Sequence, residues 1–358
     1  LLTSAYFLGF GLFQIPLGLL LDRWGPRRVE AALLLVAALG CTVFALGQDL
    51  QTLAVGRALI GLGVSACLMA SFKAFSQWFP AERMPSLSAT IMVAGGLGAL
   101  SASVPVAAAL PLLGWRGVFA SVAVLLVGAA ALLMTTPEQR THGASESLLQ
   151  QLRSLGGIYG NRVFWRFAPQ GALVVGGFMA LQGLWAVPWL MEVNHASRTL
   201  AAEVLLAMAI AQLGGFLLVA VGSGWLAQHG LGPMRLLSAG MGLALVVEVA
   251  ILRQWAAPLL LWPLLGLSFS LGNIAYSQLA AAFAVSLAGR VNTALNLAVF
   301  VGAFGLQWGI GAVIDALVTH GLARAAAFEA TLLALLVLQT LAFAWFLVPA
   351  HNPPAVTR

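Results

Sequence analysis

Long apolar runs, separated by short polar segments, follow one another along the whole chain. Each run has about 20 residues or more, which is enough for a helix to cross the roughly 30 Å hydrocarbon core of a bilayer. Apolar positions do not alternate with polar ones, so the strands of a membrane barrel are excluded. The pattern predicts an all-α membrane protein with eleven spans, at residues 1–21, 29–47, 52–78, 86–111, 115–134, 164–190, 200–226, 234–252, 257–285, 293–316 and 325–348.

The longest polar interval, residues 135–163, separates the first five spans from the last six. We therefore predict an N-terminal bundle at 1–134, a central cytoplasmic loop at 135–163, a C-terminal bundle at 164–348 and a cytoplasmic tail at 349–358.

A short repeat supports a division into two halves. The turn Gly25-Pro26-Arg27-Arg28 returns as Gly232-Pro233-Met234-Arg235, at an offset of 207 residues (232 minus 25). Arg83 returns as Arg290 at the same offset. Such a repeat predicts two pseudo-symmetric helical bundles related by an axis along the membrane normal.

Composition excludes a soluble globular protein, because 61% of the residues are hydrophobic, 8% are charged and the mean hydropathy is +0.97. The formal net charge of +6 does not indicate nucleic-acid binding, since the arginines are scattered among short loops. They orient the chain instead. With the charged turn at Asp22–Arg28 in the cytoplasm, the predicted external loops hold only Arg116, Arg198, Arg253 and Arg324.

The turn Gly18-Leu-Leu-Leu-Asp22-Arg23-Trp24-Gly25-Pro26-Arg27-Arg28 is the densest cluster of charge in the chain. It resembles the loop between the second and third helices of the major facilitator superfamily, whose pattern is Gly-x-x-x-Asp-Arg-x-Gly-x-Arg-Arg. The resemblance implies a secondary transporter in which Asp22 latches the two halves in one conformation. Gly18 would allow close helix packing and Gly25 a tight turn, while Arg23, Arg27 and Arg28 have positive-inside anchoring as their alternative role.

The charged turn follows the first apolar run, whereas in the superfamily it follows the second helix. We therefore expect that the eleven spans are family helices 2–12 of a twelve-helix protein and that the first helix is missing, with a natural eleven-helix protein as the alternative. Within the superfamily, the chain is similar to bacterial permeases grouped loosely with sugar-phosphate and nitrate/nitrite porters. This implies a multi-pass protein of the cell membrane, namely the bacterial inner membrane.

Arg57 is the charged residue placed best to act within a span. Gly61 and Ser65 follow it at i+4 and i+8, on one helical face. The stretch from Gly56 to Gly63 resembles the fourth-helix motif of the superfamily, an arginine followed by glycines. Arg57 is either a cavity residue that binds a substrate anion or supports proton coupling, or an arginine that reaches the external interface. Lys73, lower in the same span, is expected to reach the cytoplasmic interface.

The second half offers two polar sets as candidate cavity residues. Gln182, Trp185 and Trp189 share a face by i+3 and i+7 spacing, and they form either an external gate or an interfacial aromatic belt. A second set, near the middle of the 257–285 span, either lines the cavity or bonds between helices; its members are Ser270, Asn273, Tyr276 and Ser277.

No carboxylate is expected at mid-membrane: Glu248 and Asp315 lie near predicted external ends, and Glu30 lies near a cytoplasmic one. A proton carrier would then belong to the missing helix, unless coupling uses no buried acid. The sequence shows no nucleotide-binding loop, metal constellation or nucleophile elbow, so no metal, cofactor or enzymatic activity is expected.

Secondary active transport by alternating access is the predicted function. The expected partners are membrane lipid, a small-molecule substrate and a proton or other coupling ion, for a monomer that binds no nucleic acid. Arg57 and Lys73 slightly favour an anionic substrate. The alternative is multidrug efflux by proton antiport. The fifth-helix motif of drug/proton antiporters has a Gly-Pro-x-x-Gly-Gly core, and its absence from the 86–111 span opposes this alternative. A membrane-embedded enzyme or a non-transporting sensor is a more remote alternative.

Overall fold

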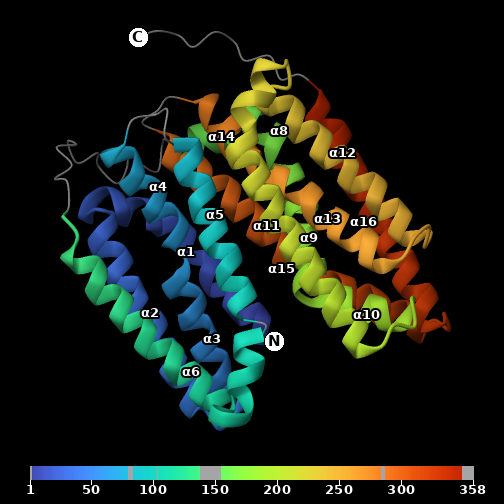
Figure 1. Cartoon of the computed structure of the whole chain (residues 1–358), viewed down its shortest axis with the longest axis horizontal. Helices are drawn as coiled ribbons and strands as arrows, with labels where there is room; N and C mark the ends of the chain where they lie inside the picture. The colour runs from blue at the N-terminus through green and yellow to red at the C-terminus, as the bar shows by residue number, and fades with distance from the viewer. Residues whose placement is uncertain (1, 80–83, 103, 138–154, 284–286, 349–358) are drawn as a thin grey trace. The chain divides into compact units, whose positions relative to one another are not determined.

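The computed structural model describes residues 2–79, 84–102, 104–137, 155–283 and 287–348, which are nearly all helical and contain no strand (Figure 1). The chain divides into two compact units. The first comprises residues 1–91, 101–158 and 286–297, and the second comprises residues 92–100, 159–285 and 298–358.

Six helices supply most of the first unit: α1 (Leu2–Trp24), α2 (Pro26–Leu46), α3 (Leu50–Val64), α4 (Cys67–Trp78), α5 (Met84–Ser101) and α6 (Val104–Thr135). Asp49 caps α3 by accepting hydrogen bonds from the backbone nitrogen and the hydroxyl of Thr52, both at 2.8 Å, and these bonds lower the pKa of Asp49. Gly114 breaks α6 with φ 64° and ψ 169°. The break falls where the sequence predicts the turn between the spans 86–111 and 115–134.

The second unit begins with a segment of mixed helix type: α8 (Arg162–Gln170), the π-helical turn η2 (Gly171–Val175), α9 (Gly176–Ala180), the π-helical turn η3 (Leu181–Trp185) and α10 (Ala186–Glu192). It continues with α11 (Arg198–Gln228), α12 (Pro233–Leu252), α13 (Pro258–Ser270), the 3₁₀ turn η4 (Leu271–Asn273), α14 (Ile274–Ala281), α15 (Ala288–Thr319) and α16 (Arg324–Leu347). Two helices, α5 and α15, contribute residues to both units.

The expectation of an all-helical membrane protein is confirmed. In the described part of the chain, nine helical segments are long and apolar enough to cross a membrane. They match nine of the eleven predicted spans, and α1 and α5 occupy the positions of the other two. The count of eleven therefore stays a prediction.

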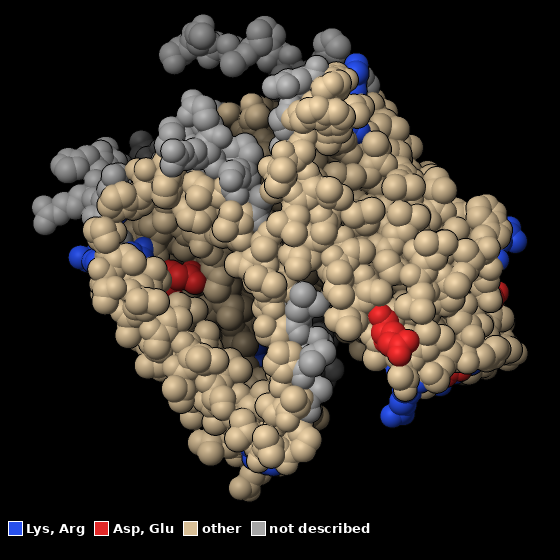
Figure 2. Space-filling model, in the orientation of Figure 1, with Lys and Arg blue, Asp and Glu red and all other residues tan. Residues whose placement is uncertain are grey.

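The helix surfaces fit a lipid environment. Leu112 and Val221 are each 85% exposed, and such apolar exposure is unfavourable in water but normal against acyl chains. Figure 2 shows a face that is almost entirely uncharged.

The two units repeat one pattern of helix packing. In the first unit, α1 packs on α3, α2 on α3, and α2 on α6; in the second, α11 packs on α13, α12 on α13, and α12 on α16. Figure 1 shows α2 and α6 running side by side. Helices α2 and α12 begin at Pro26 and Pro233, so the sequence repeat marks the start of corresponding helices.

Glycines bring α2 and α3 together in the first unit. A Cβ at Gly56 would lie 2.8 Å from the Phe44 nitrogen, and a Cβ at Gly40 would lie 2.7 Å from the Ile60 nitrogen. A Cβ at Gly63 would clash with the Ala37 backbone. Backbones that approach this closely gain dispersion contacts without hydrophobic help, which is how helices associate in lipid.

We expect Gly63→Ala to lower the thermal stability of the purified protein, by about 1–3 kcal/mol, because an overpacked interface must separate. Gly128→Ala in α6 is the matched control, since no described atom lies within 4 Å of its Cβ position. Alanine favours helix over glycine by up to about 1 kcal/mol, so the control should be neutral or stabilising. Thermal unfolding in detergent, followed by circular dichroism, measures both. Equal midpoints for the two variants would contradict the proposed packing role.

Candidate functional site

The charged turn connects α1 to α2 through Gly25. This residue has φ 79° and ψ 158°, a region that L side chains rarely adopt, and its nitrogen donates to the Leu21 carbonyl oxygen at 3.2 Å. Pro26 then starts α2 at a position where the missing N–H costs nothing. The turn therefore needs both residues in this order.

Arg27 joins the start of α2 to the end of α6. Its Nη1 donates to the carbonyl oxygens of Thr136, at 2.7 Å, and Met134, at 3.4 Å. Arg23 is exposed and its guanidinium lies 5.9 Å from the Trp24 ring centroid, and Arg28 is exposed as well. The side chain of Asp22 lies outside the described residues. A Cβ at Gly18 would meet no described atom within 4 Å, so the close helix packing expected at that glycine stays a prediction.

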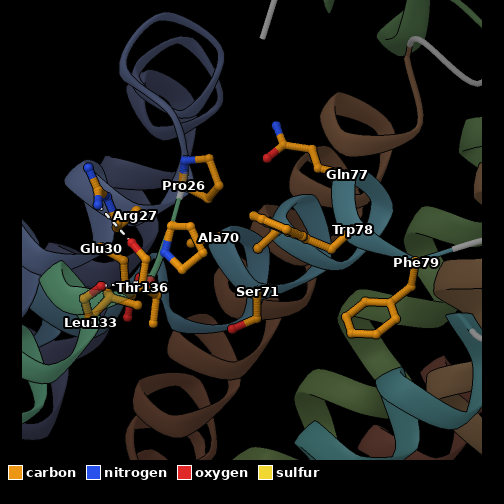
Figure 3. A pocket seen from close by; sticks show the side chains of 12 residues that line it. Pro26, Arg27, Glu30, Ala70, Ser71, Gln77, Trp78, Phe79, Leu133 and Thr136 are labelled. Carbon is orange, nitrogen blue, oxygen red and sulfur yellow. Dashed lines mark hydrogen bonds between the residues drawn. The ribbon is translucent and has the colours of Figure 1, made fainter. Parts of the chain in front are cut away.

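A pocket of about 390 Å³ adjoins this turn, between α2, α4 and the end of α6 (Figure 3). Arg27, Glu30 and Thr136 lie together on one side of it, and Gln77 lies along α4. Glu30 Oε2 and Gln77 Oε1 are buried and without a hydrogen-bond partner among the described residues. Lys73 lies nearby in α4 and donates to the Leu21 carbonyl oxygen at 2.9 Å, so in the structure it caps α1.

Arg57 lies over two aromatic rings. Its guanidinium carbon is 4.7 Å from the Phe44 ring centroid and 5.3 Å from that of Phe119, so α2, α3 and α6 meet around one cation. Arg57 Nε is buried without an acceptor, and no carboxylate pairs with the guanidinium in the described part of the unit.

Gly61 and Ser65 do not gather around Arg57. Gly61 packs directly on the Tyr6 backbone, and Ser65 is 2% exposed with its hydroxyl donating to the Leu62 carbonyl oxygen at 2.7 Å. The Ser65 carbonyl oxygen in turn accepts from Gln14 Nε2 at 3.1 Å. Both residues thus serve the contact of α3 with α1, while the long Arg57 side chain turns toward the aromatic pair.

The π-helical turns alter the register of the predicted gate. A π-helical turn adds a residue to the helical repeat, so the i+3 and i+7 spacing no longer defines one face. Gln182 Nε2 donates to Gln212 Oε1 of α11 at 3.4 Å, and Trp185 Nε1 donates to the Gln307 carbonyl oxygen of α15 at 3.0 Å. Trp189 is fully buried, which makes it part of the core of the second unit.

The second polar set also spreads over different neighbours. Ser270 packs on Gly215 of α11, and its hydroxyl donates to the Leu267 carbonyl oxygen at 2.6 Å. Asn273 Nδ2 donates to Met92 Sδ of α5 at 3.6 Å. Ser277 is exposed and donates to its own helix, and Tyr276 is half-buried. The 3₁₀ turn η4 lies in the middle of this set and changes the helical repeat, so the residues before and after it do not share one face.

Sequence reasoning missed a buried acid. Glu248 in α12 is 8% exposed and accepts a hydrogen bond from Gln339 of α16, which is fully buried. Its helix position suggests an external end, but its partners place it inside the second unit. No local signal pairs two residues that lie 91 positions apart in the chain. Among the described residues, no group of three or more His, Cys, Asp or Glu could hold a metal ion.

These observations define a class: a polytopic membrane protein built from two helical units in which three helix pairs correspond. The chain belongs to the major facilitator superfamily, because the family model described as Major Facilitator Superfamily matches residues 1–306. The members of this family are transporters.

Named relatives resemble only parts of the chain. It is 39% identical over 67 residues to the nitrate/nitrite transporter NrtP of Picosynechococcus, covering 19% of this chain and 12% of that protein. It is 28% identical over 184 residues to the hexuronate transporter of Escherichia coli (strain K12), covering 47% and 43%. It is 32% identical over 263 residues to human monocarboxylate transporter 11, covering 66% and 52%. The chain thus spans about half of these relatives at most.

Solved structures share the fold. The major facilitator transporter FucP in the outward conformation aligns with a TM-score of 0.74 at 16% identity, over 96% of this chain and 88% of FucP. A single-residue variant of the Escherichia coli fucose:proton symporter FucP aligns with a TM-score of 0.71, also at 16% identity, over 95% and 90%. At this identity the likeness shows the fold alone.

The repeated Gly-Pro pair offers a matched test of the charged turn. Gly25→Ala should destabilise the protein by about 1–2 kcal/mol, because φ 79° places a Cβ against the carbonyl oxygen. Gly232→Ala should not, since Gly232 has φ −64° and open space around its Cβ position. Thermal unfolding in detergent compares the two. A similar loss in both variants would show that the conformation of Gly25 is not the cause.

Proposed function

We propose that this chain is a secondary active transporter that moves a small organic or inorganic anion across the bacterial inner membrane by alternating access. It acts as a monomer, with a proton or another ion as the coupling ion. The bundles 1–134 and 164–348 are the two halves that exchange access. Nitrate, hexuronate and monocarboxylate, which name three of its relatives, are all anions.

Arg57 carries the proposal. It is a cation within a membrane span, and such a charge is expensive in lipid unless a partner or a cavity compensates it. The guanidinium carbon lies over the Phe44 and Phe119 rings, and no carboxylate pairs with its N–H groups among the described residues. Nε lacks an acceptor there, so an anionic oxygen would supply what this group is missing.

We expect Arg57→Ala to raise the KM for the transported anion about tenfold or more, because a charge-assisted hydrogen bond contributes roughly 1.5–3 kcal/mol. Arg57→Lys should restore only part of the affinity, since an ammonium does not reproduce the planar contact. The measurement is uptake of radiolabelled nitrate, a hexuronate and a monocarboxylate by proteoliposomes of the whole protein.

Arg116→Ala is the matched control. Arg116 also lies over an aromatic ring, with its guanidinium carbon 4.2 Å from the Trp115 centroid, but its Nη2 already donates to the Gly47 carbonyl oxygen at 3.0 Å. Its removal should leave KM unchanged. If Arg57→Ala transports every anion of the panel as the parent does, Arg57 has only a structural role.

The charged turn has a separate role in this proposal. Asp22 latches the two halves in one conformation, so Asp22→Asn should slow the exchange between inward- and outward-facing states. Equilibrium binding to either state should remain nearly intact, since the turn lies outside the membrane interior. Transport rates measured beside substrate binding separate the two effects. If Asp22→Asn transports at the parent rate, the charged turn serves only to orient the chain in the membrane.

A further inference from the structure

The second unit holds a buried polar cluster that the proposed anion site does not use. Gln339 Nε2 of α16 lies 3.3 Å from Glu248 Oε1 of α12 and 3.3 Å from the carbonyl oxygen of Leu173 in the π-helical turn η2. A Cβ at Gly177 would lie 2.9 Å from that nitrogen, so the glycine leaves room for the amide. Three helices thus meet on one side chain, which is itself fully buried.

No cation compensates Glu248 among the described residues. Of the elements packed on α12, α13 and η4 carry no charged residue, α14 carries only Tyr276 as a titratable group, and α16 carries Arg324 and Glu329 near its start. The basic groups on or beside these elements have other partners or lie beyond the helix. Arg324 pairs with Glu192 at 3.4 Å, Arg166 donates to the Phe346 carbonyl oxygen at 2.6 Å, Arg235 donates to the Gly230 carbonyl oxygen at 2.8 Å, and Arg253 follows the last residue of α12. Gln339 is the polar group that meets the carboxyl.

A proton completes this cluster. An ionised carboxylate with one amide donor and no counter-charge would carry an uncompensated desolvation cost of several kcal/mol. The neutral acid avoids that cost and gains an O–H donor. Gln339 Oε1 is a buried acceptor without a donor among the described residues. A protonated Glu248 would carry an O–H donor for this acceptor, while Gln339 Nε2 would still donate to Glu248 Oε1 and to the Leu173 carbonyl oxygen.

We propose that Glu248 is a proton-binding site of the C-terminal unit, and that Gln339 links its protonation state to the π-helical turn Gly171–Val175. Protonation forms an O–H bond on Glu248 and breaks one in a hydronium ion on one side of the membrane. Release on the other side breaks the Glu248 O–H bond and forms hydronium again. As a coupling site this rests on the proposed transport function; as a proton site it stands on the cluster alone.

Infrared difference spectroscopy of the whole protein in liposomes, titrated over pH in H2O and D2O, tests the site without any substrate. In a Glu30→Gln background, which removes the other carboxyl with a buried unpaired oxygen, the protein should show the C=O stretch of a protonated carboxyl that shifts in D2O and disappears reversibly at high pH, and adding Glu248→Gln should abolish it. Glu329→Gln, which changes an exposed carboxyl of α16, should keep it. A Glu30→Gln spectrum without this band, or a band that survives when Glu248→Gln is added, would overturn the proposal.

A second variant tests the link to the helix. Gln339→Met keeps the length of the side chain but removes both polar atoms, so it should move the pH midpoint of the band. It should also change hydrogen exchange in Gly171–Val175, which the parent should show to depend on pH. An unchanged midpoint, or exchange that does not depend on pH, would leave Glu248 a buried acid with a structural role only.

Transport assays distinguish an error about proton coupling through Glu248 from an error about the proposed anion substrate. With an anion that the parent accumulates under a proton gradient, Glu248→Gln should lose accumulation by more than tenfold and retain downhill exchange. Accumulation equal to that of the parent would refute proton coupling through Glu248. If the parent transports no anion of the panel, the substrate class proposed above is wrong, and the infrared titration still decides the proton site.

Discussion

A polar group in hydrocarbon has no water to bond, so it must find its partner within the protein. This constraint explains why the chain is helical throughout its spans and why helices meet where side chains are smallest. At Gly40, Gly56 and Gly63 the backbones of α2 and α3 come into direct contact, and at Gly61 the same helix meets Tyr6 of α1. Close backbone packing therefore holds helix α3 on two sides, against α2 and against α1.

Each unit encloses an ionisable side chain, and the surroundings of the two differ. In the first, Arg57 keeps its charge and is held by the faces of Phe44 and Phe119, which do not satisfy its hydrogen-bonding edge. In the second, Glu248 meets a single amide and no cation among the described residues, which suits a neutral acid. Under the proposed function, Arg57 provides an anion site in the first unit and Glu248 a proton site in the second. Coupled transport of an anion and a proton requires a site for each.

Helix irregularities accompany these sites. The turn η2 lies where Gln339 bonds to Leu173, and η3 ends at Trp185, whose indole donates to α15. Within a π-helical turn the backbone hydrogen-bonding pattern changes, which makes such turns common at functional positions. Under the proposal for Glu248, the segment Arg162–Glu192, which contains both turns, is the element of the second unit most able to respond to a change at that residue.

The apolar runs and the charged turn determined the class of protein, the approximate helix positions and the relation of the turns at Gly25 and Gly232, because these depend on local hydropathy and turn chemistry. Tertiary structure alone decided which polar side chains meet. Periodicity put Arg57, Gly61 and Ser65 on one face, but a long side chain can leave the face on which its Cα lies. Likewise, nothing near Glu248 in the sequence predicts Gln339, because a hydrogen bond between α12 and α16 exists only once both helices have packed.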